Sequence, residues 1–433
     1  MSKNNSIGLT TATAIVIANM IGAGIFTSLG FQLVDTVNSW SIVILWCLGA
    51  LMALCGALSY SEIGTYWVRS GGEYHFLSKA FHPLLGYLSG WVSLTIGFSA
   101  PIALSGMALG AYVAPYLGLS DLVLAVFTIL TISFFHSLSI KRSSILQNST
   151  TLLKIALILV IIYFGLTRTP MSSAFDFSES WKQELLLPAF AVSFVYVTFS
   201  YSGWNAAAYI VDEIRDVRKN LPRALLLGTL VVSILYLLLN YVFLRQNSLE
   251  AIQGQLEIGQ LTAISIFGDR GGELISFGIA FMLVSSISAM VWAGPRVTQV
   301  MAEDHALWRW FALKTKHKVP LRAIWLQTAI TLVLLFTGTF EQVMVYSGFV
   351  LQLSAALAVG AVFVVRRKNK TKSGFRSPFF PVPQIIFLLF SAWVLIYLVF
   401  AQPFETGLGF LNLVLGFLAY KIDGFYGRKK HRV

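Results

Sequence analysis

The sequence ANMIGAGIFTSL, residues Ala18–Leu29, lies inside the first long apolar segment of the chain, Ile7–Phe31. Within it, Gly22 and Gly24 flank Ala23 close to the expected centre of a membrane span. Each glycine costs about 1 kcal/mol relative to alanine in a helix interior. Packing between helices through small residues is one explanation and stays open here. The other is an interrupted helix, because irregular backbone at mid-membrane is tolerated where it is buried or lines a polar cavity.

The composition is that of a polytopic membrane protein. Of the 433 residues, 56% are hydrophobic and only 12% are charged. Apolar runs recur from end to end, and about twelve membrane spans fit a chain of this length. These runs include 40–60, 84–109, 122–135, 152–166, 225–244, 326–338 and 385–401. We therefore expect an all-α membrane protein that is embedded in the lipid bilayer and has no separate soluble domain.

The formal net charge of +12 indicates orientation in the membrane, and we expect no nucleic-acid partner. Most lysine and arginine residues fall on one side of the predicted spans, among them the basic segments 366–376 and 421–432. Cytoplasmic loops of membrane proteins carry such an excess. The pattern predicts a multi-pass protein of the cell membrane with both termini in the cytoplasm.

A second interruption is predicted in the sixth span, which starts near Leu185. Its centre, Ser200–Gly203, again places small and hydroxylic residues at mid-span. This segment lies about five spans after the first interruption, although the two halves share little sequence identity. Interrupted spans at corresponding positions of two halves are the best sequence indication of a transporter binding site.

Five motifs together resemble the amino acid–polyamine–organocation superfamily, especially its L-amino acid transporter branch. They are IGAGIF (21–26), SGGEYHFLSKAF (70–81), FSYSGWN (199–205), EIRDVRKNLPRA (213–224) and FRSPFFPVP (375–383). The resemblance implies a leucine-transporter fold, with helices 1 and 6 broken, two inverted repeats of five helices and two peripheral helices. The expected divisions are a first repeat at 1–168, an outer loop at 169–184, a second repeat at 185–366, and a basic loop, helices 11–12 and a tail at 367–433.

The resemblance also implies where a substrate amino acid would bind. The N-terminus of a half-helix presents free N–H groups and a positive dipole end to a carboxylate, and we assign this role to Ala23, Gly24 and Ile25. Carbonyl groups at half-helix C-termini accept from an ammonium group, and the candidates are those of Met20 and Ile21 on helix 1 and of Phe199 and Ser202 on helix 6. The expected substrate-binding residues are Met20, Ile21, Gly22, Ala23, Gly24, Ile25, Phe199, Ser200, Ser202 and Gly203. Many members of the superfamily have serine where this chain has Ala23, so one hydroxyl donor is missing here.

A gate is expected beside this site. Phe199 matches the aromatic residue that closes over bound substrate in the resembling family, and packing of an ordinary core aromatic is the alternative. Trp204 and Asn205 match neighbouring family positions, and Asn205 is expected to hold the unwound segment through side-chain hydrogen bonds. Tyr201 is expected to pack between helices.

Lys154 is the most unusual residue of the fifth span. An ionisable side chain inside a span is costly and indicates function by default. In the resembling family a lysine on helix 5 replaces a sodium ion between helices 1 and 8, with Ser285, Ser286 and Ser288 as candidate neighbours here. A lysine in this place would also be able to carry a proton. Snorkelling of Lys154 to the cytoplasmic headgroups is the alternative.

The segment 73–81 has helical periodicity, and we expect an amphipathic helix along the cytoplasmic face with Glu73, His75 and Lys79 on its polar side. The acidic residues near the inner gate are expected to form ion pairs with basic loop residues. The acids are Glu62, Glu73, Asp212 and Glu213, and the expected partners are Arg69, Arg215 and Arg218.

These patterns favour a sodium-independent secondary transporter of neutral L-amino acids, either an exchanger or a proton-coupled symporter. A transporter of cationic amino acids or polyamines is less favoured, because we expect no acidic residue in the two interruptions or in the outer halves of spans 3, 8 and 10. A polytopic membrane enzyme is the alternative from another class, but Ser202 has no intramembrane histidine or aspartate in its half of the chain.

We expect no cofactor and no metal, since the six histidines show no ligand spacing. Cys47 and Cys55 both lie in the second span, so we expect no disulfide-linked heavy chain of the kind that some members of the superfamily bind through an outer-loop cysteine.

Overall fold

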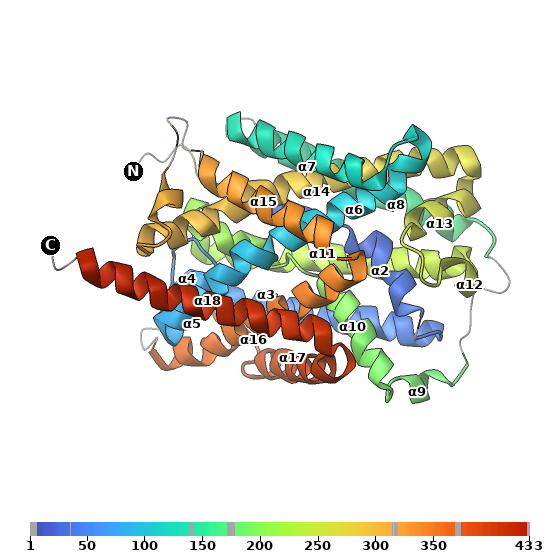
Figure 1. Cartoon of the computed structure of the whole chain (residues 1–433). Coiled ribbons are helices and arrows are strands. Elements are labelled where there is room, and N and C mark those ends of the chain that lie inside the picture. Colours follow the sequence, from blue (N-terminus) through green and yellow to red (C-terminus); the bar gives the residue numbers. More distant parts are fainter. Residues whose placement is uncertain are drawn as a thin grey trace.

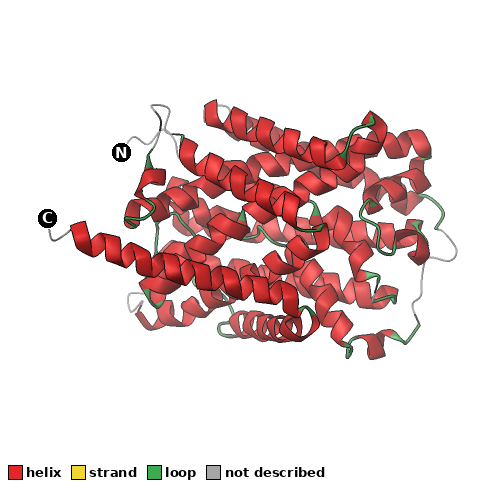
Figure 2. Cartoon of the chain, viewed as in Figure 1, coloured by secondary structure: helices red, strands yellow, loops and turns green. Residues whose placement is uncertain are grey.

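The computed structural model describes residues 7–34, 36–138, 143–170, 178–313, 315, 319–368 and 374–430. In this part of the chain the backbone is helical, apart from loops and one isolated bridge between Ile7 and Ile214 (Figure 2). The long helices are α3 (Ser39–Tyr66), α5 (Pro83–Val92), α6 (Ser99–Leu117), α7 (Asp121–Leu138), α8 (Ser143–Thr167), α11 (Val217–Gln246), α14 (Asp269–Asp304), α15 (Leu321–Thr337), α16 (Phe340–Lys368), α17 (Val382–Ala401) and α18 (Pro403–Lys430). Short helices are α4 (Glu73–Ala80), α9 (Trp181–Glu184), α12 (Leu249–Ile252), α13 (Ile258–Phe267) and η4 (Arg309–Ala312).

The expected polytopic architecture is confirmed. Nine helical segments of the described chain are long and apolar enough to cross a membrane. Shorter apolar helices at Thr151–Thr167, Pro188–Ser200 and Leu321–Thr337 fill the places of the fifth, sixth and ninth predicted spans. In Figure 1, α7 and α17 run along opposite edges of the helical assembly, and few of their residues are buried, as expected for helices that face lipid.

Both predicted interruptions are present. The first span consists of α1 (Leu9–Met20) and α2 (Gly24–Gln32), with three non-helical residues between them. The sixth span consists of α10 (Pro188–Ser200) and the 3₁₀ helix η3 (Ala206–Glu213). The connecting residues include Gly203, whose φ of 94° is a conformation that side-chain-bearing residues rarely adopt.

Neighbouring helices enclose the interruptions. The half-helix α1 packs against α11, α8 and α14, while α10 packs against α2, α3, α16 and α17. The third span is itself irregular, because a π-helical turn, η2 (Ser93–Gly97), joins α5 to α6. π-Helical turns are often found at functional sites. Broken backbone is therefore buried inside the helical assembly, where protein groups can satisfy its hydrogen bonds.

The expectation that segment 73–81 lies on the cytoplasmic surface is wrong. Helix α4 is inserted between α5 and α16, and Glu73 and His75 are buried, while Lys79 remains exposed. Burial lowers the pKa of His75 to about 4, and the positive charges of Arg69 and Lys79 lower it further. Periodicity failed here because polar side chains of a short helix can face a polar interior.

Candidate functional site

The two interruptions contact each other through glycine. A Cβ atom on Gly24 would lie 2.7 Å from the Ser200 Oγ and 2.8 Å from the Ser200 Cα. A Cβ atom on Gly203 would lie 2.7 Å from the Asn19 carbonyl carbon and oxygen. Real Cβ atoms do not approach so closely, so each broken helix requires glycine where it meets the other.

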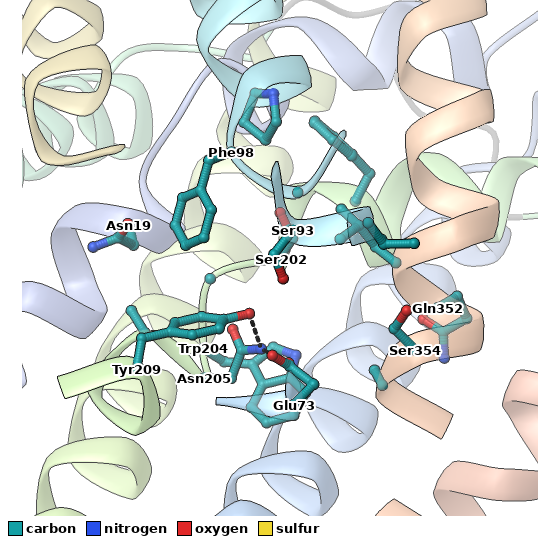
Figure 3. Close-up of a pocket in the computed structure, with 18 of the residues that line it drawn as sticks. Asn19, Glu73, Ser93, Phe98, Ser202, Trp204, Asn205, Tyr209, Gln352 and Ser354 are labelled. Atoms are coloured by element: carbon teal, nitrogen blue, oxygen red, sulfur yellow. Dashed lines mark hydrogen bonds between the residues drawn. The ribbon is translucent and has the colours of Figure 1, made fainter. Parts of the chain in front are cut away.

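Two cavities adjoin this crossing. The smaller, of about 20 Å³, lies between the broken helices and is lined by Asn19, Met20, Gly22, Ala23, Gly24, Pro101, Leu104, Ser105, Phe199, Ser200, Ser202 and Met290. The larger, of about 100 Å³, shares Asn19, Pro101, Phe199, Ser202 and Met290 with it (Figure 3). The larger cavity continues along Gly203, Trp204, Asn205 and Tyr209 to Glu73, and along Ser93, Phe98, Gln352 and Ser354 on other helices. The two cavities thus provide a space that begins at the interruptions and is lined by both polar and apolar groups.

The start of α2 offers backbone donors to the smaller cavity. Ala23 is the residue before this helix, and no side chain caps the helix there. The Phe26 amide donates to the Ala23 carbonyl at 3.0 Å, so the preceding amides are the free N-terminal donors. Ala23 and Gly24 line the cavity, whereas Ile25 is fully buried and lines neither cavity. An anion between the broken helices would meet these donors and the positive dipole end of α2.

The end of α1 is bound by other parts of the protein. The Tyr236 hydroxyl donates to the Met20 carbonyl at 2.6 Å. The Ile21 carbonyl accepts from the Lys154 ammonium at 3.1 Å and from the Ser286 hydroxyl at 2.8 Å. These two carbonyls, expected to bind a substrate ammonium group, therefore already have protein donors.

Lys154 lies against the end of α1 inside the protein. Its side chain is fully buried, and its ammonium also donates to the Ala18 carbonyl at 3.2 Å and to the Ser286 Oγ at 2.7 Å. Of the three serines considered as neighbours, the structure selects Ser286; Ser288 instead contacts His136. Lys154, on α8 in the fifth span, thus joins α1 of the first span to α14 of the eighth span through charge-assisted hydrogen bonds.

The aromatic and polar residues around the sixth-span interruption have separate environments. Phe199 lines both cavities. Trp204 packs edge-on against Tyr60, with ring centroids 4.7 Å apart. Tyr201 is buried and donates to the Trp46 carbonyl at 3.1 Å, which agrees with a packing role. The Ser200 hydroxyl donates to the Tyr196 carbonyl within its own helix and contacts the Ser28 hydroxyl.

Asn205 is fixed by side chains that the sequence did not indicate. Its amide nitrogen donates to the Glu73 Oε1 at 2.6 Å and to the Tyr209 hydroxyl at 3.2 Å. The Tyr60 hydroxyl donates to the same Glu73 oxygen at 2.7 Å. Tyr60, Tyr209 and Tyr236 are ordinary apolar-run residues in the sequence, so only their hydroxyl contacts reveal that they hold the interruptions.

The ion-pair partners expected for the acidic residues are wrong. Arg366 binds Glu62 through two hydrogen bonds of 2.8 and 2.9 Å, Arg69 pairs with Asp304 at 2.9 Å, and Arg296 lies 3.5 Å from Glu213. Glu73 forms no salt bridge within the described residues. These partners are distant in sequence, and spacing within one loop could not predict them. No group of three potential metal ligands occurs among the described residues.

The fold and the site define a class: a polytopic helical membrane protein in which two broken helices meet beside a small cavity. Comparison with known proteins gives the family. The model of the amino acid permease family matches residues 7–418, nearly the whole chain. The chain therefore belongs to the amino acid permease family, whose members are transporters and not enzymes.

Individual relatives agree with this assignment. The serine/threonine exchanger SteT of Bacillus subtilis is 29% identical over 436 residues, covering 98% of this chain and 97% of that protein. The b(0,+)-type amino acid transporter 1 of mouse is 26% identical, covering 98% of this chain and 89% of that protein. The human cystine/glutamate transporter is 26% identical, with 97% and 85% covered. These relatives are amino acid transporters, and this chain is an amino acid transporter of a membrane.

Proposed function

We propose that the protein is a sodium-independent secondary transporter of neutral L-amino acids that works by alternating access, as an exchanger or a proton-coupled symporter. The observation that carries this proposal is the contact between the Lys154 ammonium and the end of α1. A fixed cation supplies the positive charge that a bound sodium ion would otherwise bring between α1, α8 and α14. Transport would then need no sodium.

The zwitterion is assigned to the two adjoining cavities together, with its carboxylate group in the smaller one. The amides of Ala23 and Gly24 line it, and we propose that they bind the carboxylate. The ammonium group is assigned to backbone carbonyls of the interruptions. The Met20 and Ile21 carbonyls are less available for this role than the sequence indicated, since protein donors already bind them. The preferred residues for binding the ammonium group are Asn19, Phe199 and Ser202, because they line both cavities.

Closure over this site is assigned to Phe199, with Trp204 and Asn205 beside it. Phe199 lines both cavities, so a change in its position would connect or separate them. Trp204 and Asn205 are attached to Tyr60 and Glu73, which belong to the first half of the chain. Movement of the sixth span would therefore be transmitted to α3 and α4.

The proposal extends to topology and partners. Basic residues at the loops and tail support cytoplasmic termini in the cell membrane. The backbone pairing of Ile7 with Glu213 and Arg215 also joins the start of the chain to the loop after the sixth span. We assign 1–168 and 185–366 to two inverted repeats of five helices, joined by 169–184 and followed by 367–433. Cys55 is buried and Cys47 lies in the same span, which supports action without a disulfide-linked heavy chain.

A cationic substrate is the second candidate, and one observation favours it. Glu73 is an acidic residue that lines the larger cavity. The sequence argument against a cationic substrate considered the interruptions and the outer halves of spans 3, 8 and 10, and did not include this residue.

Transport by purified protein in proteoliposomes tests the proposal. Vesicles loaded with unlabelled L-amino acid should accumulate labelled serine, alanine or leucine. For each of these amino acids, the rate in sodium buffer should equal the rate in choline buffer. Uptake into empty vesicles that is driven by an imposed proton gradient would indicate symport, whereas uptake that requires amino acid inside the vesicles would indicate exchange. Uptake of labelled lysine or arginine would indicate the second candidate, a cationic substrate. A strict requirement for sodium would contradict the role given to Lys154, and a lack of transport of every amino acid would contradict the function.

A further inference from the structure

Hydroxyl groups join the outer halves of the two broken spans, α2 and α10. The Ser28 hydroxyl of α2 lies 2.9 Å from the Ser200 hydroxyl of α10. The Thr36 hydroxyl, just after α2, lies 3.0 Å from the Ser193 hydroxyl of α10. All four side chains are buried, so separating the two helices would leave polar groups without partners. We therefore expect α2 and α10 to move together.

An aromatic layer packs these two half-helices against α16. The Phe31 ring of α2 stacks on the Phe340 ring of α16, with centroids 5.8 Å apart and planes 11° from parallel. The Tyr196 ring of α10 lies 6.0 Å from the Phe31 ring. The Tyr196 hydroxyl donates to the Glu341 Oε1 at 2.5 Å. A hydrogen bond to a carboxylate thus joins α10 to α16 beside the packed rings.

This layer lies on the outer side of both cavities in the proposed topology. Tyr196 precedes Phe199, which lines both cavities, by about one helical turn. Phe340 precedes Gly348, which lines the larger cavity, by roughly 12 Å of helix. Helix α9, which leads into α10, lies at the end of the assembly opposite the chain termini (Figure 1). An amino acid that arrives from that end must therefore pass the layer.

The chemistry of the layer suits a barrier that opens. A zwitterion crosses packed aromatic rings only by losing its water, which is costly for both of its charged groups. Tyr196 is buried, whereas Glu341 is exposed. When α10 separates from α16, water can replace the tyrosine hydroxyl at the Glu341 carboxylate. The hydrogen bond therefore favours the closed arrangement without locking it.

We propose that Phe31, Tyr196 and Phe340 form an outer barrier, and that the Tyr196–Glu341 hydrogen bond sets the fraction of molecules in which this barrier is open. This inference rests on the proposed alternating access and names residues that regulate it. Phe199 would close over the bound substrate, and the layer would close the route to it. Removing the hydrogen bond should shift the population toward the open state.

Reaction of a cysteine behind the barrier tests the inference in whole cells. The full-length protein with Cys47→Ala and Cys55→Ala receives Thr198→Cys, a position that lines the larger cavity. A membrane-impermeant cationic methanethiosulfonate is added outside, and its rate of reaction is proportional to the open fraction. Leu186→Cys, at a residue 83% exposed before α10, is the control position and should react equally fast in every variant.

Tyr196→Phe keeps the ring and removes the hydroxyl. The rate at Thr198→Cys should rise about three- to tenfold, less than for a fully buried bond because water solvates the freed carboxylate. Glu341→Gln keeps a neutral acceptor, so the rate should rise about twofold. Combining Tyr196→Phe with Glu341→Ala should give the rate of Tyr196→Phe alone, because both changes remove one interaction. Tyr163→Phe, at an exposed tyrosine of α8, is the matched control and should leave the rate unchanged.

Each outcome decides between this inference and the proposed function. Equal rates at Thr198→Cys with and without Tyr196→Phe would overturn the inference, as would independent, multiplying effects of the two changes in the double variant. Failure of Thr198→Cys to react in any variant, while Leu186→Cys reacts, would also overturn it. Failure of Leu186→Cys to react from outside would instead contradict the proposed topology. Transport in proteoliposomes tests the proposed function separately.

Discussion

The ammonium of Lys154 lies 3.1 Å from the carbonyl oxygen of Ile21, the first residue after α1. The same carbonyl accepts from Ser286 of α14, so one backbone group joins the broken first span to α8, which carries Lys154, and to α14. A helix that ends at mid-membrane leaves carbonyls unpaired, and each would be costly in lipid. Lys154 and Ser286 satisfy this carbonyl and hold the end of α1 in place.

Replacing Lys154 should therefore reduce transport strongly. In Lys154→Ala the Ile21 and Ala18 carbonyls lose a charged donor, and a loss of about 2 kcal/mol would reduce the rate more than tenfold. Initial rates of amino acid exchange in proteoliposomes measure this effect. Lys79→Ala is the matched control, because Lys79 is an exposed lysine. Similar rates for the two variants would contradict a special role for Lys154.

A side chain at Gly24 should abolish substrate binding. In Gly24→Val the new Cβ would collide with the backbone of Ser200 and separate the two interruptions. We expect binding to weaken more than tenfold while the protein remains monodisperse in gel filtration. Gly407→Val is the control, since a Cβ there meets no atom within 4 Å. Wild-type affinity in Gly24→Val would remove the assignment of the carboxylate to this helix start.

The pair of Glu62 and Arg366 should contribute to stability. Glu62 is buried and accepts two hydrogen bonds from Arg366 and one from the Ser377 amide. Breaking a buried ion pair costs about 3–5 kcal/mol, so Glu62→Gln should lower the apparent Tm in detergent by several degrees. Lys182→Ala disrupts an exposed pair with Glu179 and should change Tm little. Equal Tm values for all three proteins would show that the buried pair is dispensable.

Burial of His75 should make the protein less stable in acid. Its pKa is lowered to about 4, so the unfolded chain binds the proton more tightly and stability falls as the pH drops from 6.5 to 4. A shift of this size corresponds to about 3 kcal/mol at most.

Thermal unfolding in detergent between pH 7 and pH 4.5 measures this dependence. The fall in Tm should be smaller in His75→Gln than in the wild-type protein. The exposed residue His82 provides a control, because His82→Gln should keep the wild-type pH dependence. An unchanged pH dependence in His75→Gln would show that other groups cause the acid sensitivity.

The sequence by itself determined the all-helical membrane architecture and the positions of both interruptions. These features depend on local properties: the length of apolar runs, and glycine and hydroxylic residues at mid-span. Lys154 stood out for the same reason, because a charge inside an apolar run is visible without any partner.

Only the tertiary structure decided which groups meet. It placed Ser286 on Lys154, Arg366 on Glu62, and Glu73 in the cavity wall. Such contacts join residues far apart in the chain, and their identity depends on how the helices pack. Glu73 shows the difference most clearly: its helical periodicity indicated a surface position, whereas packing buried it beside the unwound segment, where Tyr60 and Asn205 donate to it.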